Sequence, residues 1–302
     1  MSDCRYSSNS WSVDHGCVAS SVKGRDKVVL TYIKNDKYSS QEIQLQGISN
    51  PEVILFARTT QRNLYVSSEN TVHIYDLGRQ KVSKSFRLKS KVSSFVLNTT
   101  DSYLAAGCED GSIQLVTVGT NQTSVPLTNN KCTGQKISAL KYSSFKSSFL
   151  AASCESGVVS FWDCNTNKNV FSLSPHLAPA KDLAFSPINA NLVVSVGLDK
   201  SLVCCNPNTK TSLMTIKVDQ PLTAVDFEND GVNLAVGTSR GRLVVYDLRN
   251  TKEPVLSIAA HNSSVSSAVF KSKLLGRLSS SSSNLTSSNK VVGSRLRLND
   301  NV

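Results

Sequence analysis

The chain has 302 residues and a mass of 32.6 kDa, and 39% of its residues are apolar, which is enough to bury a substantial core. No stretch approaches the roughly 20 uninterrupted apolar residues of a membrane span, and residues 1–30 lack the apolar centre of a signal peptide. Eight cysteines without a Cys-x-x-Cys pair are too sparse for a disulfide-stapled scaffold. We therefore expect a cytoplasmic protein rather than a membrane or secreted one.

The net charge of +11 makes an acidic partner such as nucleic acid worth considering. Residues 271–302 carry six basic residues against the single acid Asp300, so this segment alone holds +5. It has no aromatic residue on which bases could stack, so we do not expect nucleic acid as the partner. Its serine-rich composition predicts a basic disordered tail, and the run Ser279–Ser283 is a candidate for phosphorylation.

Short runs of β-branched and small apolar residues, bounded by Gly, Asp, Asn and Ser, recur along the chain and predict β-strands. In chain order they cover residues 27–32, 63–68, 71–77, 103–108, 112–117, 137–143, 149–154, 157–163, 170–174, 180–187, 191–197, 201–206, 212–216, 222–227, 233–238, 242–248 and 265–270.

An internal repeat orders these strands. The segments 71–77, 157–163 and 242–248 each contain an aromatic residue followed by Asp, and degenerate copies lie between and before them. The markers recur every 41 to 46 residues, at Tyr32, Asp76, Thr117, Asp163, Asn206 and Asp247. Four short strands per repeat, without helical periodicity, are typical of a β-propeller blade.

This segmentation resembles the WD-repeat family, and the resemblance implies an all-β propeller over residues 1–270, followed by the tail 271–302. Six complete repeats run from about Cys4 to about Ala260, and the strand 265–270 begins a seventh. A ring of the seven-bladed family would be completed by about 35 residues before Met1, so the pattern implies a missing N-terminal blade.

The family resemblance also implies a hydrogen-bonded tetrad of Asp, Ser or Thr, His and Trp within a blade. One repeat supplies His176, Ser195 and Asp199, but has Cys205 and Asn206 in place of the Trp-Asp pair. The repeat with Trp162 and Asp163 has Glu155 in its turn instead of Asp, and two further repeats have the pairs Tyr75-Asp76 and Tyr246-Asp247. Since no repeat is complete, we expect packing rather than tetrads to hold the ring.

Candidate catalytic and metal-binding patterns are weak. The G-x-S-x-G pattern at 237–241 lies between two predicted strands, where a β-turn explains it. The four histidines lie in different repeats, without the spacing of metal ligands, and the adjacent Cys204 and Cys205 point to opposite faces of a strand. There is no phosphate-binding loop. We expect no enzyme activity, no cofactor and no metal; a propeller hydrolase would require acid and nucleophile residues converging in the central channel.

More specific stretches, at 140–167, 176–202 and 221–249, resemble the propeller of the WD-repeat gamma-tubulin ring complex targeting factors (the GCP-WD family). The resemblance is strongest from Ile137 to Phe270 and implies a non-catalytic adaptor. Such an adaptor brings the gamma-tubulin ring complex to the centrosome, spindle poles and spindle microtubules for microtubule nucleation in mitosis. The implied partners are this complex and centrosomal and spindle-associated proteins.

The chain differs from that family after Phe270, where 32 polar residues show no heptad pattern. In the family a separate helical region holds the ring complex, so direct binding of the complex by this chain stays open. We expect partner contacts in the loops Lys34–Gln41 and Asn129–Gln135, with Lys34, Lys37 and Lys131 as candidates. The alternative is a generic WD-repeat scaffold in another assembly, such as ubiquitin-ligase or RNA-processing machinery.

Overall fold

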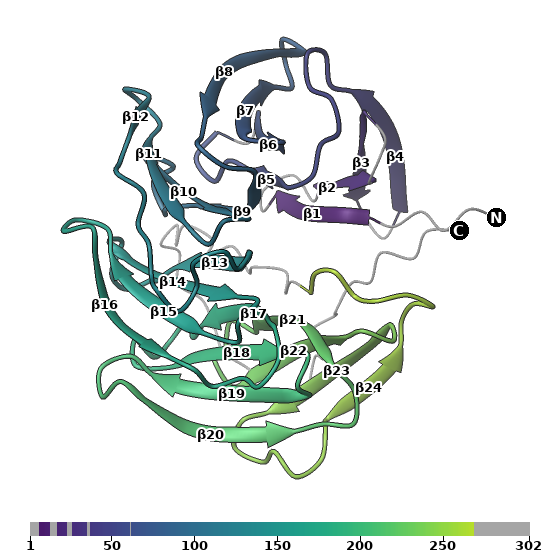
Figure 1. Ribbon diagram of the computed structural model, residues 1–302. Coiled ribbons are helices and arrows are strands. Elements are labelled where there is room, and N and C mark those ends of the chain that lie inside the picture. The colour runs from purple at the N-terminus through teal and green to yellow at the C-terminus, as the bar shows by residue number, and fades with distance from the viewer. Residues whose placement is uncertain (1–5, 13–16, 23–25, 35–36, 61, 269–302) are drawn as a thin grey trace, which may run out of the picture.

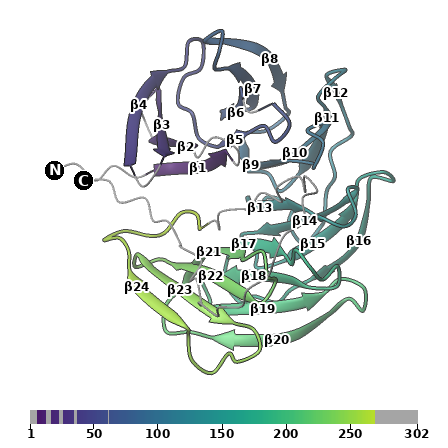
Figure 2. The ribbon, with the colours of Figure 1, turned by 180° about the vertical axis from the view of Figure 1, so that it is seen from behind.

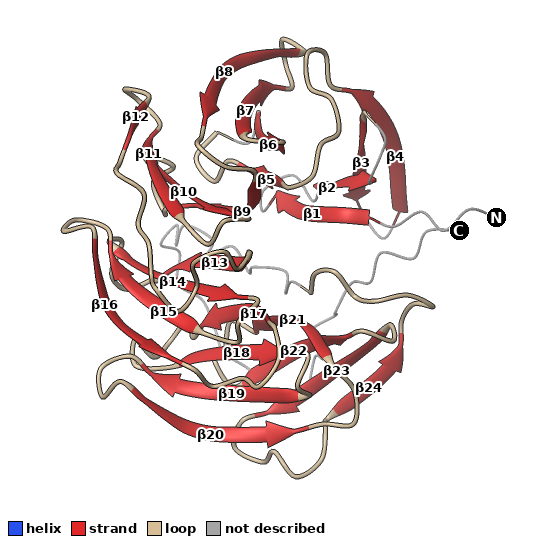
Figure 3. Cartoon of the chain, in the orientation of Figure 1, coloured by secondary structure: helices blue, strands red, loops and turns tan. Residues whose placement is uncertain are grey.

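The computed structural model describes residues 6–12, 17–22, 26–34, 37–60 and 62–268. All the regular structure in these ranges is β-strand (Figure 3). In this described part of the chain no helix is present that could span a membrane.

Six four-stranded antiparallel sheets, numbered here as blades 1 to 6, follow one another along the chain. Blade 1 contains β1 (Tyr6–Ser12), β2 (Cys17–Val22), β3 (Lys27–Lys34) and β4 (Lys37–Gln44). Blade 2 contains β5 (Ile54–Phe56), β6 (Asn63–Ser68), β7 (Thr71–Asp76) and β8 (Lys81–Arg87). Blade 3 contains β9 (Val92–Leu97), β10 (Tyr103–Cys108), β11 (Ile113–Thr117) and β12 (Gln122–Thr123). Blade 4 contains β13 (Ile137–Tyr142), β14 (Phe149–Cys154), β15 (Val159–Asp163) and β16 (Lys168–Leu173). Blade 5 contains β17 (Ala180–Phe185), β18 (Val193–Gly197), β19 (Ser201–Asn206) and β20 (Thr211–Lys217). Blade 6 contains β21 (Leu222–Phe227), β22 (Asn233–Thr238), β23 (Arg242–Asp247) and β24 (Leu256–Ala259).

The blades are arranged around a common axis, as in a propeller. The first strand of each blade lies nearest the axis and the fourth lies at the periphery (Figure 1), and the view from behind shows the same order (Figure 2). The innermost strands of blades 3 to 6 contact their neighbours in the ring, as do those of blades 1 and 2. The middle strands are buried on both faces because a blade packs against each side, which explains their continuous apolar runs.

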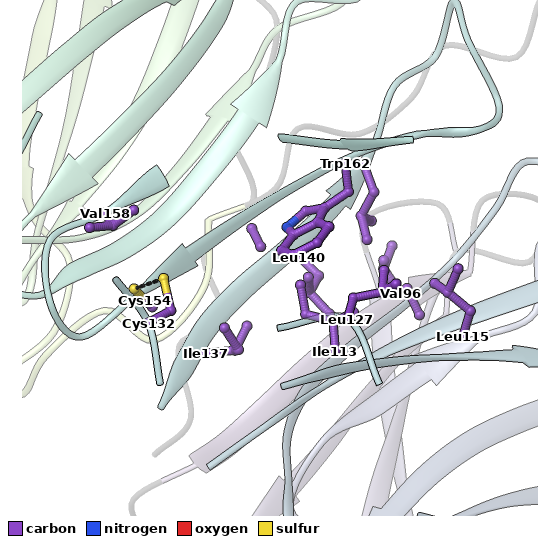
Figure 4. Close-up of a cluster of buried hydrophobic side chains, with 13 residues drawn as sticks. Val96, Ile113, Leu115, Leu127, Cys132, Ile137, Leu140, Cys154, Val158 and Trp162 are labelled. Atoms are coloured by element: carbon purple, nitrogen blue, oxygen red, sulfur yellow. Dashed lines mark hydrogen bonds between the residues drawn. The ribbon is translucent and has the colours of Figure 1, made fainter. Parts of the chain in front are cut away.

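The hydrophobic core is divided among the interfaces between blades. Five buried clusters each join two consecutive blades, from blades 1 and 2 to blades 5 and 6. Between blades 3 and 4, Ile113 and Leu127 face Leu140 and Trp162 (Figure 4). Among the described residues, none of these clusters joins blade 6 to blade 1. Stability therefore comes from neighbour-to-neighbour burial around the ring.

Aromatic stacking strengthens the interface between blades 4 and 5. The ring of Phe161 is fully buried, with its centroid 4.3 Å from that of Phe171 and 5.8 Å from that of Phe149, both nearly parallel to it. Phe185 of blade 5 meets Phe149 edge to face at 6.2 Å. These separations fall in the favourable range for aromatic pairs.

The repeat pattern predicted the strand ends closely. The markers Asp76, Thr117, Asp163, Asn206 and Asp247 are the last residues of β7, β11, β15, β19 and β23. The prediction of an all-β propeller is confirmed, with six blades in the described residues. The seventh blade is not confirmed, because residues 260–268 form no assigned strand and Phe270 lies outside the described residues, as does the tail 271–302.

Candidate docking face and the buried network of blade 5

The residues that close each repeat form turns at one edge of the ring. Asp76 accepts hydrogen bonds from the backbone N–H groups of Gly78 and Arg79, at 2.8 and 3.0 Å. Asp163, Asn206 and Asp247 accept equivalent bonds from the second residue after each of them. An Asp or Asn at this place satisfies turn amides that no strand can pair, which explains why the repeat ends on these residue types.

The aromatic residue before each turn Asp points inward instead. Tyr75, Trp162 and Tyr246 are all nearly fully buried, in the clusters between blades. The indole nitrogen of Trp162 has no hydrogen-bond partner. Trp162 thus packs as an apolar side chain and is not joined to a tetrad.

The three residues predicted to share a tetrad do come together in blade 5. Asp199 accepts a hydrogen bond from Nδ1 of His176 at 3.1 Å, and Nε2 of His176 lies 2.9 Å from the hydroxyl of Ser195. Asp199 also accepts from the hydroxyl and backbone N–H of Ser201 and from the N–H of Leu177. The network therefore ties the connection before β17 to the turn between β18 and β19.

Burial lowers the pKa of His176, although its hydrogen bond to Asp199 acts in the opposite direction. Burial raises the pKa of Asp199, but the hydrogen bonds from Ser201, Leu177 and His176 outweigh it and hold that pKa below its usual value. At neutral pH a neutral imidazole therefore donates to a carboxylate and accepts from the hydroxyl of Ser195.

Ser195, His176 and Asp199 are hydrogen-bonded in the order of a catalytic triad, but a substrate cannot reach them. Ser195 is only 1% exposed and His176 only 3%, so no substrate carbonyl can reach the hydroxyl. The G-x-S-x-G segment 237–241 joins β22 to β23, as expected for a turn, and Gly241 has φ +80°. Within the described residues no group of three or more His, Cys, Asp or Glu side chains could hold a metal ion.

One face of the ring gathers the connections that a docking partner would meet. In an up-and-down sheet the turn between the second and third strands lies at the same edge as the connection to the next blade. Ion pairs cross between blades on this face: Glu52 to Lys91 at 2.8 Å, Glu155 to Lys181 at 3.7 Å, and Glu109 to Lys136 at 4.0 Å. The hydrogen bond and charge of Glu52 raise the pKa of Lys91. We call this surface the docking face.

One apolar side chain also stands out from the docking face. Leu177, in the connection before β17, is 94% exposed. Its exposure makes Leu177 a candidate contact residue on this face.

The predicted contact loop Asn129–Gln135 lies on the docking face, between β12 and β13. The amide of Asn129 donates to the hydroxyls of Ser160 and Ser172, both at 2.8 Å, which fixes the start of the loop on blade 4. Lys131 is exposed, so its charge is available to a partner. The prediction that Lys34–Gln41 is a loop is wrong, because Lys37–Gln44 is strand β4, paired along its length with β3.

Sequence reasoning missed a polar groove on the opposite edge, between blades 3 and 4. Its volume is about 370 Å³, and it is lined by side chains including those of Asn98, Tyr103, Gln122, Tyr142 and Asn165. Its lining comes from both blades and includes the two residues of β12. The repeat pattern does not show which side chains of neighbouring blades meet, so no sequence signal pointed to this groove.

Comparisons with known proteins agree with this architecture. A family described as nucleolar protein 10-like, N-terminal domain, a β-propeller, matches residues 119–292, and the WD domain, G-beta repeat, matches residues 81–116. Protein NEDD1 of Homo sapiens is 35% identical over 94% of the chain, that of Bos taurus 36% over 94%, and that of Mus musculus 35% over 88%. The chain spans only 42%, 42% and 40% of the length of these three relatives. The chain therefore belongs to the WD-repeat β-propeller proteins and is homologous over nearly its whole length to part of the NEDD1 proteins.

Proposed function

We propose that this chain is a non-catalytic adaptor that helps to target the gamma-tubulin ring complex to the centrosome and spindle for microtubule nucleation in mitosis. The observation that carries the proposal is the homology to NEDD1, which covers 94% of the chain. The stretches in blades 4 to 6 that resemble the gamma-tubulin ring complex targeting factors point to the same family.

The geometry supports a docking role for the propeller. Its interior is filled by hydrophobic clusters between blades, so the ring is a rigid support rather than a container. The docking face offers the exposed apolar Leu177 and the exposed cation Lys131 on connections anchored by hydrogen bonds. Preorganised loops on a rigid scaffold lose little entropy on binding. Contact with the ring complex, in this proposal, is either direct or through centrosomal and spindle-associated partners.

The experiment is affinity purification of the tagged chain from mitotic extract, with mass spectrometry and a gamma-tubulin blot. The double variant Lys131→Glu/Leu177→Ser changes the docking face, while Lys168→Glu/Leu213→Ser makes the same chemical changes on exposed residues of β16 and β20. We expect gamma-tubulin or centrosomal proteins with the wild type and the control, and a several-fold loss with the docking-face variant. Recovery of an unrelated assembly by the wild type would contradict the proposal.

We also propose that residues 261–268 enter a seventh blade position. Val265 makes the contacts that Ile137 makes at the start of blade 4: its carbonyl accepts from Thr223 at 2.7 Å, as that of Ile137 accepts from Ser93 at 2.7 Å. Val265 also packs on Gly237, as Ile137 packs on Gly107. Hydrogen exchange over residues 262–268 should show the alternating protection of a strand, whereas uniformly fast exchange would refute this assignment.

A further inference from the structure

Two buried cysteines meet between blades 3 and 4. The sulfur of Cys132, in the connection before β13, lies 2.7 Å from the sulfur of Cys154, the last residue of β14 (Figure 4). Cys132 is 3% exposed and Cys154 is fully buried, and both are free thiols. A disulfide needs the two sulfurs at about 2.05 Å, so a displacement of less than an ångström would join them. We propose that Cys132 and Cys154 are a redox-active pair that hydrogen peroxide converts to an intrachain disulfide.

The surroundings favour Cys154 as the attacking sulfur. Either sulfur can donate the hydrogen bond that joins the two thiols. With Cys132 as the donor, this bond and the backbone N–H groups of Ser156 and Val158 outweigh burial and lower the pKa of Cys154. The same pairing and its burial raise the pKa of Cys132. Cys154 is thus favoured as the thiolate, while Cys132 keeps its proton. This is the arrangement of an attacking cysteine and a resolving cysteine.

Four other described cysteines lack the hydrogen bonds that lower the pKa of Cys154. Burial raises the pKa of Cys108, Cys164 and Cys205 to about 11 in each case, and that of Cys204 to about 12. Cys204 and Cys205 are adjacent residues of β19, so their side chains point to opposite faces of the blade. They provide a matched control, with equal burial and no shared contact.

The chemistry balances with peroxide as the oxidant. Because both sulfurs are buried, peroxide reaches Cys154 when the connection before β13 opens locally. The Cys154 thiolate then attacks one peroxide oxygen, the O–O bond breaks, and the leaving hydroxide takes a proton to become water. The Cys132 sulfur then attacks the sulfenic sulfur, the S–O bond breaks, and the hydroxide leaves with the Cys132 proton as a second water. Two thiols are oxidised, peroxide is reduced, and a disulfide remains.

The disulfide between Cys132 and Cys154 would restrain the connection before β13, which carries Lys131. The structure already ties this connection to its surroundings through the Asn129 amide, through the Ser156 hydroxyl, which donates to the carbonyl of Lys131 at 2.9 Å, and through the N–H of Gly134. All these ties are hydrogen bonds, which can open. A covalent link at Cys132 would hold the centre of the connection against β14, so its opening would depend on the redox state. This inference stands apart from the proposed function.

The test uses the purified full chain, reduced and then treated with hydrogen peroxide. After alkylation of the remaining thiols under denaturing conditions, trypsin should release peptide 132–136 joined to peptide 147–168. The second peptide also contains Cys164, so fragmentation must place the bond on Cys154. Cys132→Ser should abolish the cross-link and Cys205→Ser should retain it. If Cys132 and Cys154 are both recovered alkylated under conditions that fully oxidise dithiothreitol, the proposal is overturned.

A second readout keeps the inference testable if a serine variant fails to fold. In the native wild-type chain, trypsin cleavage after Lys131 and Lys136 should slow several-fold on oxidation and recover with reductant. Equal cleavage rates in the two states would show that the bond does not restrain the connection.

Discussion

The hydrogen-bond network of blade 5 gives the sharpest prediction, because one side chain serves several buried donors. Replacing Asp199 with Ala removes the acceptor of Nδ1 of His176 and of the hydroxyl and N–H of Ser201. His176 and Ser201 are buried, whereas the N–H of Leu177 lies on an exposed residue and can bond to water. Three buried donors at about 1 kcal/mol each predict a loss of about 3 kcal/mol.

The assay is thermal and urea unfolding of the full chain followed by circular dichroism. For a domain of this size, about 3 kcal/mol corresponds to a decrease in Tm of about 6–12 °C. Asp199→Asn keeps one carbonyl acceptor and should lose about half as much. Asp163→Ala is the control, because Asp163 is partly exposed and caps a surface turn, and should cost at most about 1 kcal/mol.

The result that would refute the reasoning is equal destabilisation by Asp199→Ala and Asp163→Ala. It would mean that water replaces the carboxylate at no cost, and that packing alone holds blade 5, as the incomplete tetrads first led us to expect.

Three further outcomes follow from the same structure. Gly157→Ala should cost about 1–3 kcal/mol in urea unfolding, because Gly157 has φ +81° and an added Cβ would lie 2.4 Å from the carbonyl oxygen of His176; Gly119→Ala, which meets nothing within 4 Å, should be near neutral. Phe161→Ala should cost about 3–5 kcal/mol in the same assay, since it empties a fully buried site and removes the stack on Phe171; a cost below about 1 kcal/mol would contradict the packing described. Because the pKa of His176 is lower in the folded than in the unfolded chain, its contribution to stability is present above about pH 6.5 and is lost as the pH falls through the folded value; unfolding free energies measured from about pH 7 to 5 should decrease, and His176→Gln should reduce that slope.

The sequence predicted the strands because each repeat encodes them locally. The predicted runs beginning at Asn63, Tyr103, Phe149 and Asn233 are β6, β10, β14 and β22, with the same bounds. The short apolar runs, the turn residues between them and the period of 41 to 46 residues can all be read from the sequence alone. They do not depend on knowing which blades pack against each other. Hydrogen bonds join His176, Ser195 and Asp199 in one unit, as the family pattern implied.

The sequence could not give the contacts between repeats. Cys132 and Cys154 lie in a connection and a strand end separated by 22 positions, and nothing in their spacing marks them as a pair. The stretch Lys34–Gln41 looked like a loop because its residues are polar. Its residues 37–41 nevertheless belong to β4, the outer edge of blade 1, where one face meets water and polar residues are tolerated.

Composition and repeat period by themselves determined the class of this protein, an all-β propeller, and the aromatic-Asp pairs that end its third strands carried the resemblance to the WD-repeat family. Only the tertiary structure decided which residues act together, because the side chains that meet between blades are far apart in the sequence. The ion pairs of the docking face, the buried network around His176, the groove beside the short β12 and the thiol pair of Cys132 and Cys154 all arise there. Such contacts depend on the angle and distance at which one blade packs on the next, and no local pattern records them.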